Sequence, residues 1–183
     1  MRKILGGLLI AVGVLSVAPA AFAQDKVCDG SFGAATVGSL VVPDGATCSL
    51  NGTRVGGNIT VEAGGTLEAG AVTVRGNVQA DGAASVSITT SMVRGSVQVD
   101  RGGSAQLTAS TVLGNAAFTE NAGSVEATGN RIGGSLKAQK NTGGVTIADN
   151  QVRNNLQCSE NDPAPTGSGN QVGGSKSGQC ASL

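Results

Sequence analysis

Three consecutive blocks of 19 residues decide the fold: GNITVEAGGTLEAGAVTVR from Gly57, GNVQADGAASVSITTSMVR from Gly76 and GSVQVDRGGSAQLTASTVL from Gly95. Each block opens with Gly and a small polar residue and continues as alternating apolar and polar residues. A Gly/Ala-rich corner follows, then a second alternating run and a short third run. A repeat of fixed length near 20 residues is typical of solenoid proteins, in which each block forms one coil.

The same pattern continues on both sides of these blocks. Further blocks begin at Gly38, Gly114, Gly134, Asn154 and Gly174. The blocks from Gly114 onward are mostly 20 residues long, and the extra residue falls in the first corner. Corners accept added length more readily than strands do. The repeat frame therefore runs unbroken over residues 38–173.

Aligning the blocks places apolar residues in columns. The third position of each block holds Leu40, Ile59, Val78, Val97, Ala116, Leu136 and Leu156. A column near the end of each block holds Val55, Val74, Val93, Val112, Ile132, Val152 and Val172. Apolar residues two apart turn one face of a strand inward, whereas the spacing typical of helices is almost absent. Each block is therefore expected to form three short strands.

We predict an all-β fold, a single-stranded parallel β-helix (β-solenoid) of about seven coils of 19–20 residues. A right-handed coil is expected, because crossover connections between parallel strands are usually right-handed. The pattern of Gly, alternating aliphatic residues and corners over residues 38–173 resembles that of right-handed parallel β-helix repeat proteins. Among the small ones it resembles the bactofilins. That resemblance implies a stack of short coils that can assemble into a polymer.

The N-terminal residues have the features of a secretory signal peptide. A basic start, Arg2-Lys3, precedes an apolar stretch and a small-residue cleavage site that ends at Ala23. We expect residues 1–23 to be removed, residues 24–37 to form an N-terminal cap, residues 38–173 to form the repeats and residues 174–183 to form a C-terminal cap. A retained anchor is the alternative. The predicted protein is bacterial and exported, to the periplasm or the extracellular space, and is not inserted in a membrane after the leader is removed.

Four cysteines in an exported chain predict two disulfides. Cys28 and Cys48 lie 20 residues apart and Cys158 and Cys180 lie 22 apart, so each pair is separated by about one coil. Residues one coil apart stack at strand spacing, about 4.8 Å, which is within the Cα range of a disulfide. We predict Cys28–Cys48 and Cys158–Cys180. Four separate thiols or a metal site are the alternatives, and zinc is disfavoured because the chain has no histidine.

Both ends of the stack are expected to be capped, because an open β-helix leaves unpaired strand edges. Phe32 and Val37 can cover the first core layer. Residues 161–169 contain two prolines and are expected to form a loop instead of a strand. Lys176 takes the place of an apolar residue in the last partial coil, which disfavours stacking of a second chain. We therefore expect a monomer.

Side chains that commonly carry catalysis are scarce. The chain contains no His, Trp or Tyr and three Phe. Without His the usual general base and nucleophile activator is missing, so we predict no enzymatic activity and no cofactor. The 12 basic and 12 acidic residues become 10 and 12 when Arg2 and Lys3 are removed, a formal net charge of −2. A chain without basic surplus is not expected to bind nucleic acid.

One acidic column has the chemistry of a calcium ligand set. Glu62, Asp81 and Asp100 share the sixth position of three successive blocks, just before the first corner. Stacked like charges repel, and a bound Ca²⁺ would relieve the repulsion. Ca²⁺ takes six to eight oxygen ligands, however, and Arg101 is near enough to neutralise one carboxylate. A solvated corner is therefore favoured over a metal site.

A strip of hydroxyl side chains on the expected outer face of the second run is the candidate interaction face. Its members in the central blocks are Ser85, Ser87, Thr89, Ser104, Thr108, Ser124 and Thr128. Flat threonine arrays on β-helices are typical of some ice-binding proteins, but Glu68, Gln106 and Glu126 interrupt this one. Ordinary β-propensity on a solvated strand is the favoured interpretation. Asparagines near the block boundaries, such as Asn130 and Asn150, are expected to stack as structural amide ladders.

Four functions are compatible with these features. The preferred hypothesis is a secreted, non-catalytic structural or surface-interaction protein, since repeat scaffolds bind through extended faces. Its expected partner is an extracellular polysaccharide or a component of the cell envelope. A bactofilin-like polymer is the main alternative. A polysaccharide-acting enzyme and an ice-binding protein are less favoured, because the corners are short, aromatic residues are rare and the hydroxyl strip is interrupted.

Overall fold

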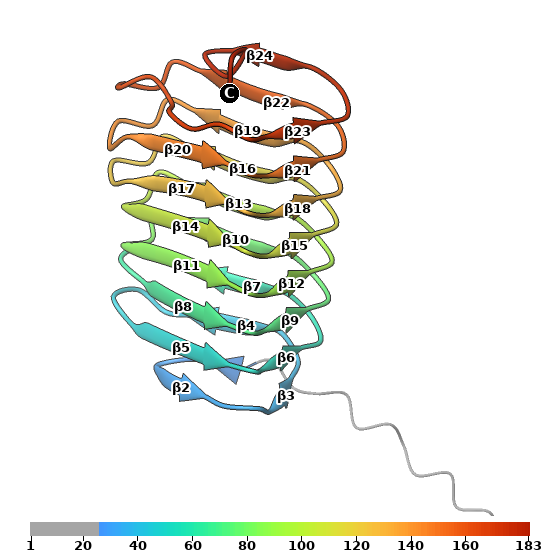
Figure 1. The fold of residues 1–183 in the computed structure, drawn as a ribbon. Helices are drawn as coiled ribbons and strands as arrows, with labels where there is room; N and C mark the ends of the chain where they lie inside the picture. The colour runs from blue at the N-terminus through green and yellow to red at the C-terminus, as the bar shows by residue number, and fades with distance from the viewer. Residues whose placement is uncertain (1–25) are drawn as a thin grey trace, which may run out of the picture.

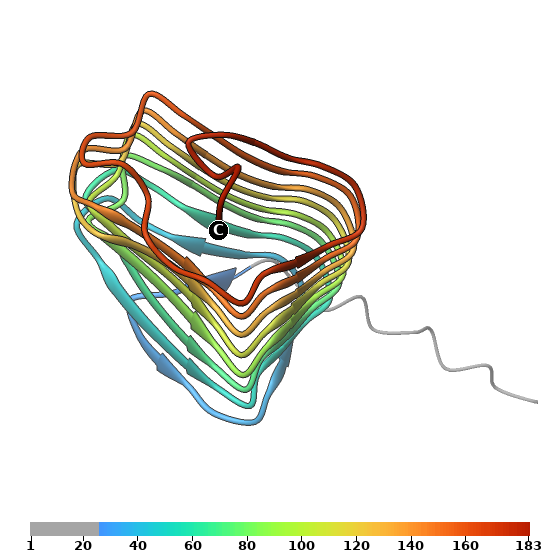
Figure 2. The same ribbon diagram turned by 45° about the horizontal axis from the view of Figure 1, so that its top comes forward.

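The computed structural model describes residues 26–183. The predicted signal peptide, residues 1–23, lies outside the described residues. The described chain contains strands and no helix, wound into a stack of about eight coils (Figure 1). From its N-terminal end the chain crosses the near side from left to right, returns along the far side and rises, so the coil is right-handed (Figures 1 and 2). The all-β parallel solenoid predicted from the repeat is confirmed.

The strands form three parallel sheets of nine, seven and eight strands. The first sheet consists of β1 (Lys26–Val27), β4 (Leu40–Val42), β7 (Ile59–Val61), β10 (Val78–Asp81), β13 (Val97–Asp100), β16 (Ala116–Thr119), β19 (Leu136–Gln139), β22 (Leu156–Ser159) and β24 (Lys176–Gly178). The second sheet consists of β2 (Gly30–Phe32), β5 (Thr47–Asn51), β8 (Thr66–Gly70), β11 (Ser85–Thr89), β14 (Ser104–Thr108), β17 (Val125–Thr128) and β20 (Val145–Ala148). The third sheet consists of β3 (Thr36–Val37), β6 (Arg54–Val55), β9 (Thr73–Val74), β12 (Met92–Val93), β15 (Thr111–Val112), β18 (Arg131–Ile132), β21 (Gln151–Val152) and β23 (Gln171–Val172). Each coil from β1 to β21 contributes one strand to each sheet, and the last part of the chain adds β22 and β24 to the first sheet and β23 to the third.

The apolar columns of the sequence are the core of the stack. Leu40 pairs with Ile59, and Ile59 pairs with Val78, in the register that the repeat predicts. Side chains in these columns are almost fully buried, except that of Val172 in the last coil, and the residues between them face outward. Burying an aliphatic side chain stabilises a fold by about 1.5–3 kcal/mol. The register is well defined, because a shift of one residue would turn every apolar side chain outward.

The corner between the second and third sheets fixes one residue per coil in the left-handed region. These residues are Gly52, Ala71, Thr90, Ala109, Gly129, Asp149 and Gly169. Only three of the seven are glycine, although a non-glycine residue there costs about 1–2 kcal/mol. In the first six of these residues the backbone N–H donates a hydrogen bond to the next coil, such as Thr90 N–H to Thr108 O at 3.0 Å, which holds this conformation in place. Coil stacking therefore overrides local preference at this corner.

Buried amide ladders fill the corners in the C-terminal half. The amide oxygen of Asn150 accepts hydrogen bonds from the backbone and side chain of Asn130, and the oxygen of Asn170 does the same for Asn150. This confirms the predicted asparagine ladder. A second ladder, through Asn121, Asn141 and Asn161, fills the first corner of the 20-residue coils. Both ladders supply hydrogen-bond partners to backbone groups that water cannot reach.

The two disulfides lie at opposite ends of the stack. Cys28–Cys48 joins the first two coils with a Cα–Cα distance of 5.4 Å, and Cys158–Cys180 joins the last two with a distance of 5.2 Å. Both pairs are those that the one-coil spacing predicts, and the described chain has no free cysteine.

The C-terminal end of the core is closed by the chain itself. Residues 179–183 fold over the last coil, where Cys180 and Leu183 join the hydrophobic core (Figure 2). The Lys176 ammonium donates a hydrogen bond to the Leu183 carbonyl, and Gln179 ends the second amide ladder at Asn161. As predicted, residues 161–169 form a loop, joined to the second sheet through a single bridge between Thr166 and Thr146.

The N-terminal end is covered less completely. Val37 is buried and Phe32 is packed against the core, as expected, but Val27 of β1 is largely exposed. Residues 26–37 contribute one strand to each sheet, which adds a turn to the seven predicted coils. No helix of the described residues is long and apolar enough to cross a membrane.

Candidate functional site

The outer face of the second sheet holds all seven hydroxyl residues of the predicted interaction face. Ser85, Ser87 and Thr89 lie on β11, and Ser104 and Thr108 lie on β14. Thr128 lies on β17, and Ser124 directly precedes that strand. Parallel pairing stacks these residues into columns one coil apart. The repeat thus brings residues that are 19 or 20 positions apart in sequence onto one surface.

Hydrogen bonds between neighbouring coils occupy much of this surface. The Ser85 and Ser104 hydroxyls lie 2.9 Å apart, and the Ser87 hydroxyl donates to Gln106 Oε1 at 2.9 Å. Gln106 Nε2 donates to Glu126 Oε2 at 3.2 Å. In the central column of the face, Ser87, Gln106 and Glu126 are therefore linked through amide and carboxylate side chains. A flat hydroxyl array, of the kind that would favour ice binding, is not formed.

Two threonines of the same face have hydroxyls that are shielded from solvent. Thr108 Oγ1 and Thr128 Oγ1 are buried and have no hydrogen-bond partner among the described residues. They stack directly on each other, with Thr89 in the preceding coil. A shielded hydroxyl cannot serve a partner that binds from solvent without rearrangement, so the hydroxyls of Thr108 and Thr128 are not available on the accessible part of the face.

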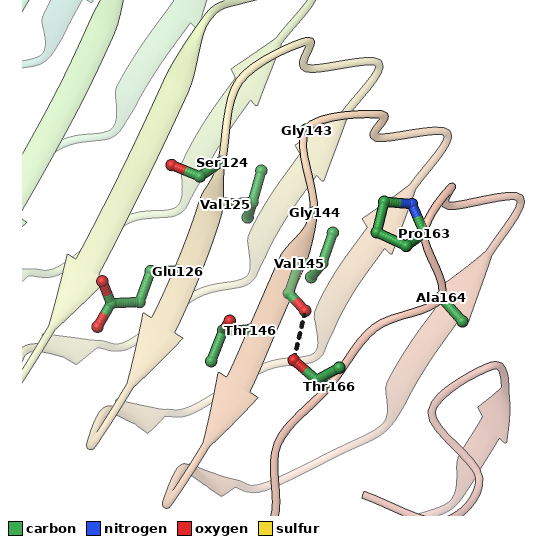
Figure 3. Close-up of a pocket in the computed structure, with 10 residues that line it drawn as sticks. All are labelled: Ser124, Val125, Glu126, Gly143, Gly144, Val145, Thr146, Pro163, Ala164 and Thr166. Atoms are coloured by element: carbon green, nitrogen blue, oxygen red, sulfur yellow. Dashed lines mark hydrogen bonds between the residues drawn. The ribbon is translucent and has the colours of Figure 1, made fainter.

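Two shallow depressions lie on this sheet. One is lined by Gly70, which has no side chain, together with Glu68, Ser49 and Ser87 of the same and neighbouring coils. The other lies at the C-terminal end, where the loop residues Pro163, Ala164 and Thr166 face β17 and β20 (Figure 3).

The side chains of the C-terminal depression offer hydrogen bonding and little else. Ser124, Thr146 and Thr166 supply hydroxyls, and Thr166 Oγ1 donates to the Val145 carbonyl at 3.4 Å. Glu126 is the only ionisable residue of the lining, and its carboxylate points away from the loop (Figure 3). A hydroxyl nucleophile needs an adjacent base and donors that stabilise the developing charge. The lining therefore suits weak contact with a polar ligand.

The acidic column predicted as a calcium candidate lies at the corner from the first to the second sheet. Asp81 pairs directly with Asp100, and Glu62 precedes them in the column. Asp81 forms an ion pair with Arg101 and accepts a hydrogen bond from its guanidinium group. This interaction raises the pKa of Arg101. Glu62 Oε2 accepts from the Asp44 backbone N–H at 3.3 Å.

Two of the three carboxylates thus already have partners within the chain. Among residues 26–183, no group of three or more His, Cys, Asp or Glu side chains is placed to hold a metal ion. The column is therefore short of the oxygen ligands that Ca²⁺ needs.

Sequence reasoning missed a separation of charge between two sides of the rod. Of the 11 acidic residues in the described chain, eight lie at or beside the corner from the first to the second sheet: Asp29, Asp44, Glu62, Asp81, Asp100, Glu120, Glu160 and Asp162. Five arginines lie on the third sheet, across the coil from that corner: Arg54, Arg75, Arg94, Arg131 and Arg153 (Figure 2). The signal was present in the aligned blocks, because each arginine lies next to an inward valine or isoleucine of one column. The net charge of the chain does not reveal this separation of charge.

Comparison with known proteins finds no matching family model, no matching curated protein and no matching solved structure.

Proposed function

We propose that the protein is an exported, non-catalytic β-solenoid that contacts other molecules through the outer faces of its sheets. The observation that carries this proposal is the contrast between the regular, accessible faces and the interior, which is occupied by buried aliphatic columns and amide ladders. Repeat scaffolds of this kind bind through extended surfaces made by neighbouring coils.

Two disulfides support export. Structural disulfides persist in oxidising compartments and are rare in a reducing cytoplasm. Both disulfides are buried in the described structure, since Cys28, Cys48, Cys158 and Cys180 belong to the hydrophobic core. They agree with the signal peptide predicted over residues 1–23.

The chemistry of the surface supports a non-catalytic role. The chain has no His, and the two hollows on the second sheet are lined mainly by hydroxyls and backbone. Polysaccharide-acting solenoids usually need carboxylate pairs in a groove, and acid–base catalysis requires such groups within reach of one substrate. Here each hollow of the second sheet holds a single carboxylate, Glu68 or Glu126, and most other carboxylates lie at the corner from the first to the second sheet.

A bactofilin-like polymer is the second candidate, and the exposed N-terminal strands favour it. Val27 of β1 is 67% exposed, and β1, β2 and β3 are edge strands of their sheets. Edge strands of this kind can pair with another chain. The opposite end carries the Lys176 charge and the folded C-terminal residues, which oppose head-to-tail stacking.

Cell fractionation with thiol labelling tests the proposal. The full-length protein, expressed in a bacterial host with an epitope tag at the C-terminus, should appear in the periplasmic or culture fraction. It should show four alkylated cysteines only after reduction. The purified protein should release no product from polygalacturonate, alginate or cellulose. Cytoplasmic protein with free thiols, or measurable product release, would overturn the proposal.

A further inference from the structure

Five arginines form a stripe along the axis of the rod, on the outer face of the third sheet. Arg54 and Arg131 begin β6 and β18, and Arg75, Arg94 and Arg153 directly follow β9, β12 and β21. The two positions flank the inward valine or isoleucine of each strand, so both point outward. From β6 to β21 the sheet advances five coils, so the stripe is about 24 Å long at about 4.8 Å per coil.

These guanidinium groups are available to a partner. All five arginines are exposed, and their side chains make no hydrogen bond or ion pair within the described structure. Arg101, which lies outside the stripe, is instead paired with Asp81. In two coils the arginine comes before the inward residue and a glycine comes after it, as in Arg54-Val55-Gly56 and Arg131-Ile132-Gly133. Those glycines leave space on the surface around Arg54 and Arg131.

Acidic side chains are excluded from this face. Among the described residues, no Asp or Glu lies on a third-sheet strand or on the corner that leads from it to the first sheet. Asp149, at the corner shared with the second sheet, is the nearest acidic residue in sequence. With most carboxylates on the opposite edge, the stripe has a positive potential although the mature chain is predicted to have a net charge of −2.

The stripe also carries two of the exposed large apolar side chains of the described chain. Met92 is 42% exposed and lies on β12, in the same coil as Arg94. Leu113 is 54% exposed and directly follows β15, between the coils of Arg94 and Arg131. This narrow line of guanidinium groups, with apolar side chains near its centre, is complementary to a linear polymer. Such a polymer would place its anionic groups against the arginines and its C–H groups against Met92 and Leu113. Arginine suits this role, because its guanidinium group binds carboxylate, sulfate or phosphate through two parallel hydrogen bonds.

Two other classes of anionic partner, nucleic acid and a membrane surface, fit the arginine stripe less well. Single-stranded nucleic acid is bound through aromatic side chains that stack on bases, and none lies on this face. Peripheral membrane binding relies on a broad apolar face with aromatic anchors, whereas this stripe is two positions wide and has two apolar side chains.

We propose that the third-sheet arginine stripe is a binding surface for a linear anionic polysaccharide that lies along the solenoid axis. The proposal rests on the proposed function as an exported interaction protein, and it names the chemical class of the partner. Binding would hold the rod to an acidic glycan through several exposed ion pairs, each weak by itself and sensitive to salt.

Binding to polygalacturonate, a carboxylated polymer, tests the proposal. The purified mature protein should bind immobilised polygalacturonate and not neutral dextran. The dissociation constant should rise roughly 10- to 100-fold between about 50 and about 200 mM NaCl, as expected when several ion pairs release counterions.

A matched pair of triple variants assigns the surface. The variant Arg54→Gln/Arg75→Gln/Arg94→Gln should bind at least about tenfold more weakly. The control Lys26→Gln/Lys137→Gln/Lys140→Gln removes the same charge from the first sheet and its corner, and should bind within about twofold of the parent. All six residues are exposed, so both variants should fold, which thermal melting followed by circular dichroism verifies.

Each contrary outcome has a distinct meaning. Equal losses in both variants would overturn the assignment to the third sheet. Binding to phosphatidylglycerol-containing vesicles or to DNA, with none to polygalacturonate, would overturn the polysaccharide class. No binding by a protein that is exported, oxidised and inactive would overturn this inference and leave the proposed function standing.

Discussion

Asn141 shows how a single polar residue supports the corner of the stack. Its side chain is 0% exposed, its amide oxygen accepts from the Asn121 backbone and side chain, and its Nδ2 donates to the Phe118 carbonyl at 3.0 Å. Replacing it, as in Asn141→Ala, leaves several buried groups without a partner. Because each such group costs about 1–3 kcal/mol, we expect the free energy of unfolding to fall by about 3 kcal/mol.

Urea denaturation followed by far-ultraviolet circular dichroism measures this loss. Asn115→Ala is the matched control, since Asn115 is exposed and accepts one hydrogen bond, from the Ser135 backbone at 2.8 Å. The control should lose no more than about 1 kcal/mol. Equal effects of the two substitutions would contradict the role assigned to the buried ladder.

Thr90 tests the strain at the second corner. It has a φ of 50°, in the column that also holds Gly52 and Gly129. A β-branched residue is disfavoured in this region, so Thr90→Gly should raise the free energy of unfolding by about 0.5–1 kcal/mol, after the entropy cost of glycine is included. Thr73→Gly, on strand β9, should lower it by about 1 kcal/mol. Destabilisation by both substitutions in urea titrations would show that Thr90 is not strained.

The sequence predicts the place of a residue well where that residue recurs at one position of the repeat. It predicts poorly those hydrogen-bond ladders and charged surfaces that depend on residues brought together by the fold. The ladder through Asn130 and Asn150 was predicted because those residues recur at one place in the block. The ladder through Asn121 and Asn141 was missed, because these residues lie at the corner where the block length changes and were treated as part of a loop. The arginine stripe was missed because nearly equal numbers of basic and acidic residues do not show on which faces the charges lie.

The disulfides act at the scale of the end coils. Each closes a loop of about one coil, with sequence separations of 20 and 22. Loops of this size give about 3 kcal/mol through the reduced entropy of the unfolded chain. We expect Cys28→Ala/Cys48→Ala and Cys158→Ala/Cys180→Ala each to lower the free energy of unfolding by roughly that amount, as measured by urea denaturation. Reduction of the parent protein should reproduce the sum. No change after reduction would contradict a structural role.

Strand positions were largely predictable, since an inward apolar residue at every second position defines a strand in a fixed register. Strands β1, β2 and β3 were less apparent, because residues 26–37 contain few of the aliphatic residues that mark later coils. Their pairing with β4, β5 and β6 depends on a neighbouring coil that offers free strand edges. The closure of the C-terminal end by Leu183 could not be predicted, because no repeat specifies it.

We infer that the whole molecule is a discrete rod that acts through its faces. The C-terminal end is closed by residues 179–183, and the N-terminal end presents the short strands β1, β2 and β3. A polymer would need these two unlike ends to match. The charge and folded chain at one end oppose such contact, whereas the long faces between the ends stay accessible.

The most direct test is the mass in solution of residues 24–183, measured by light scattering with concentration from refractive index. Absorbance at 280 nm is unsuitable, since the chain has no Trp or Tyr. We expect the mass of one chain, unchanged as concentration rises. A mass that grows with concentration, or elongated assemblies, would contradict a discrete rod and favour the polymer.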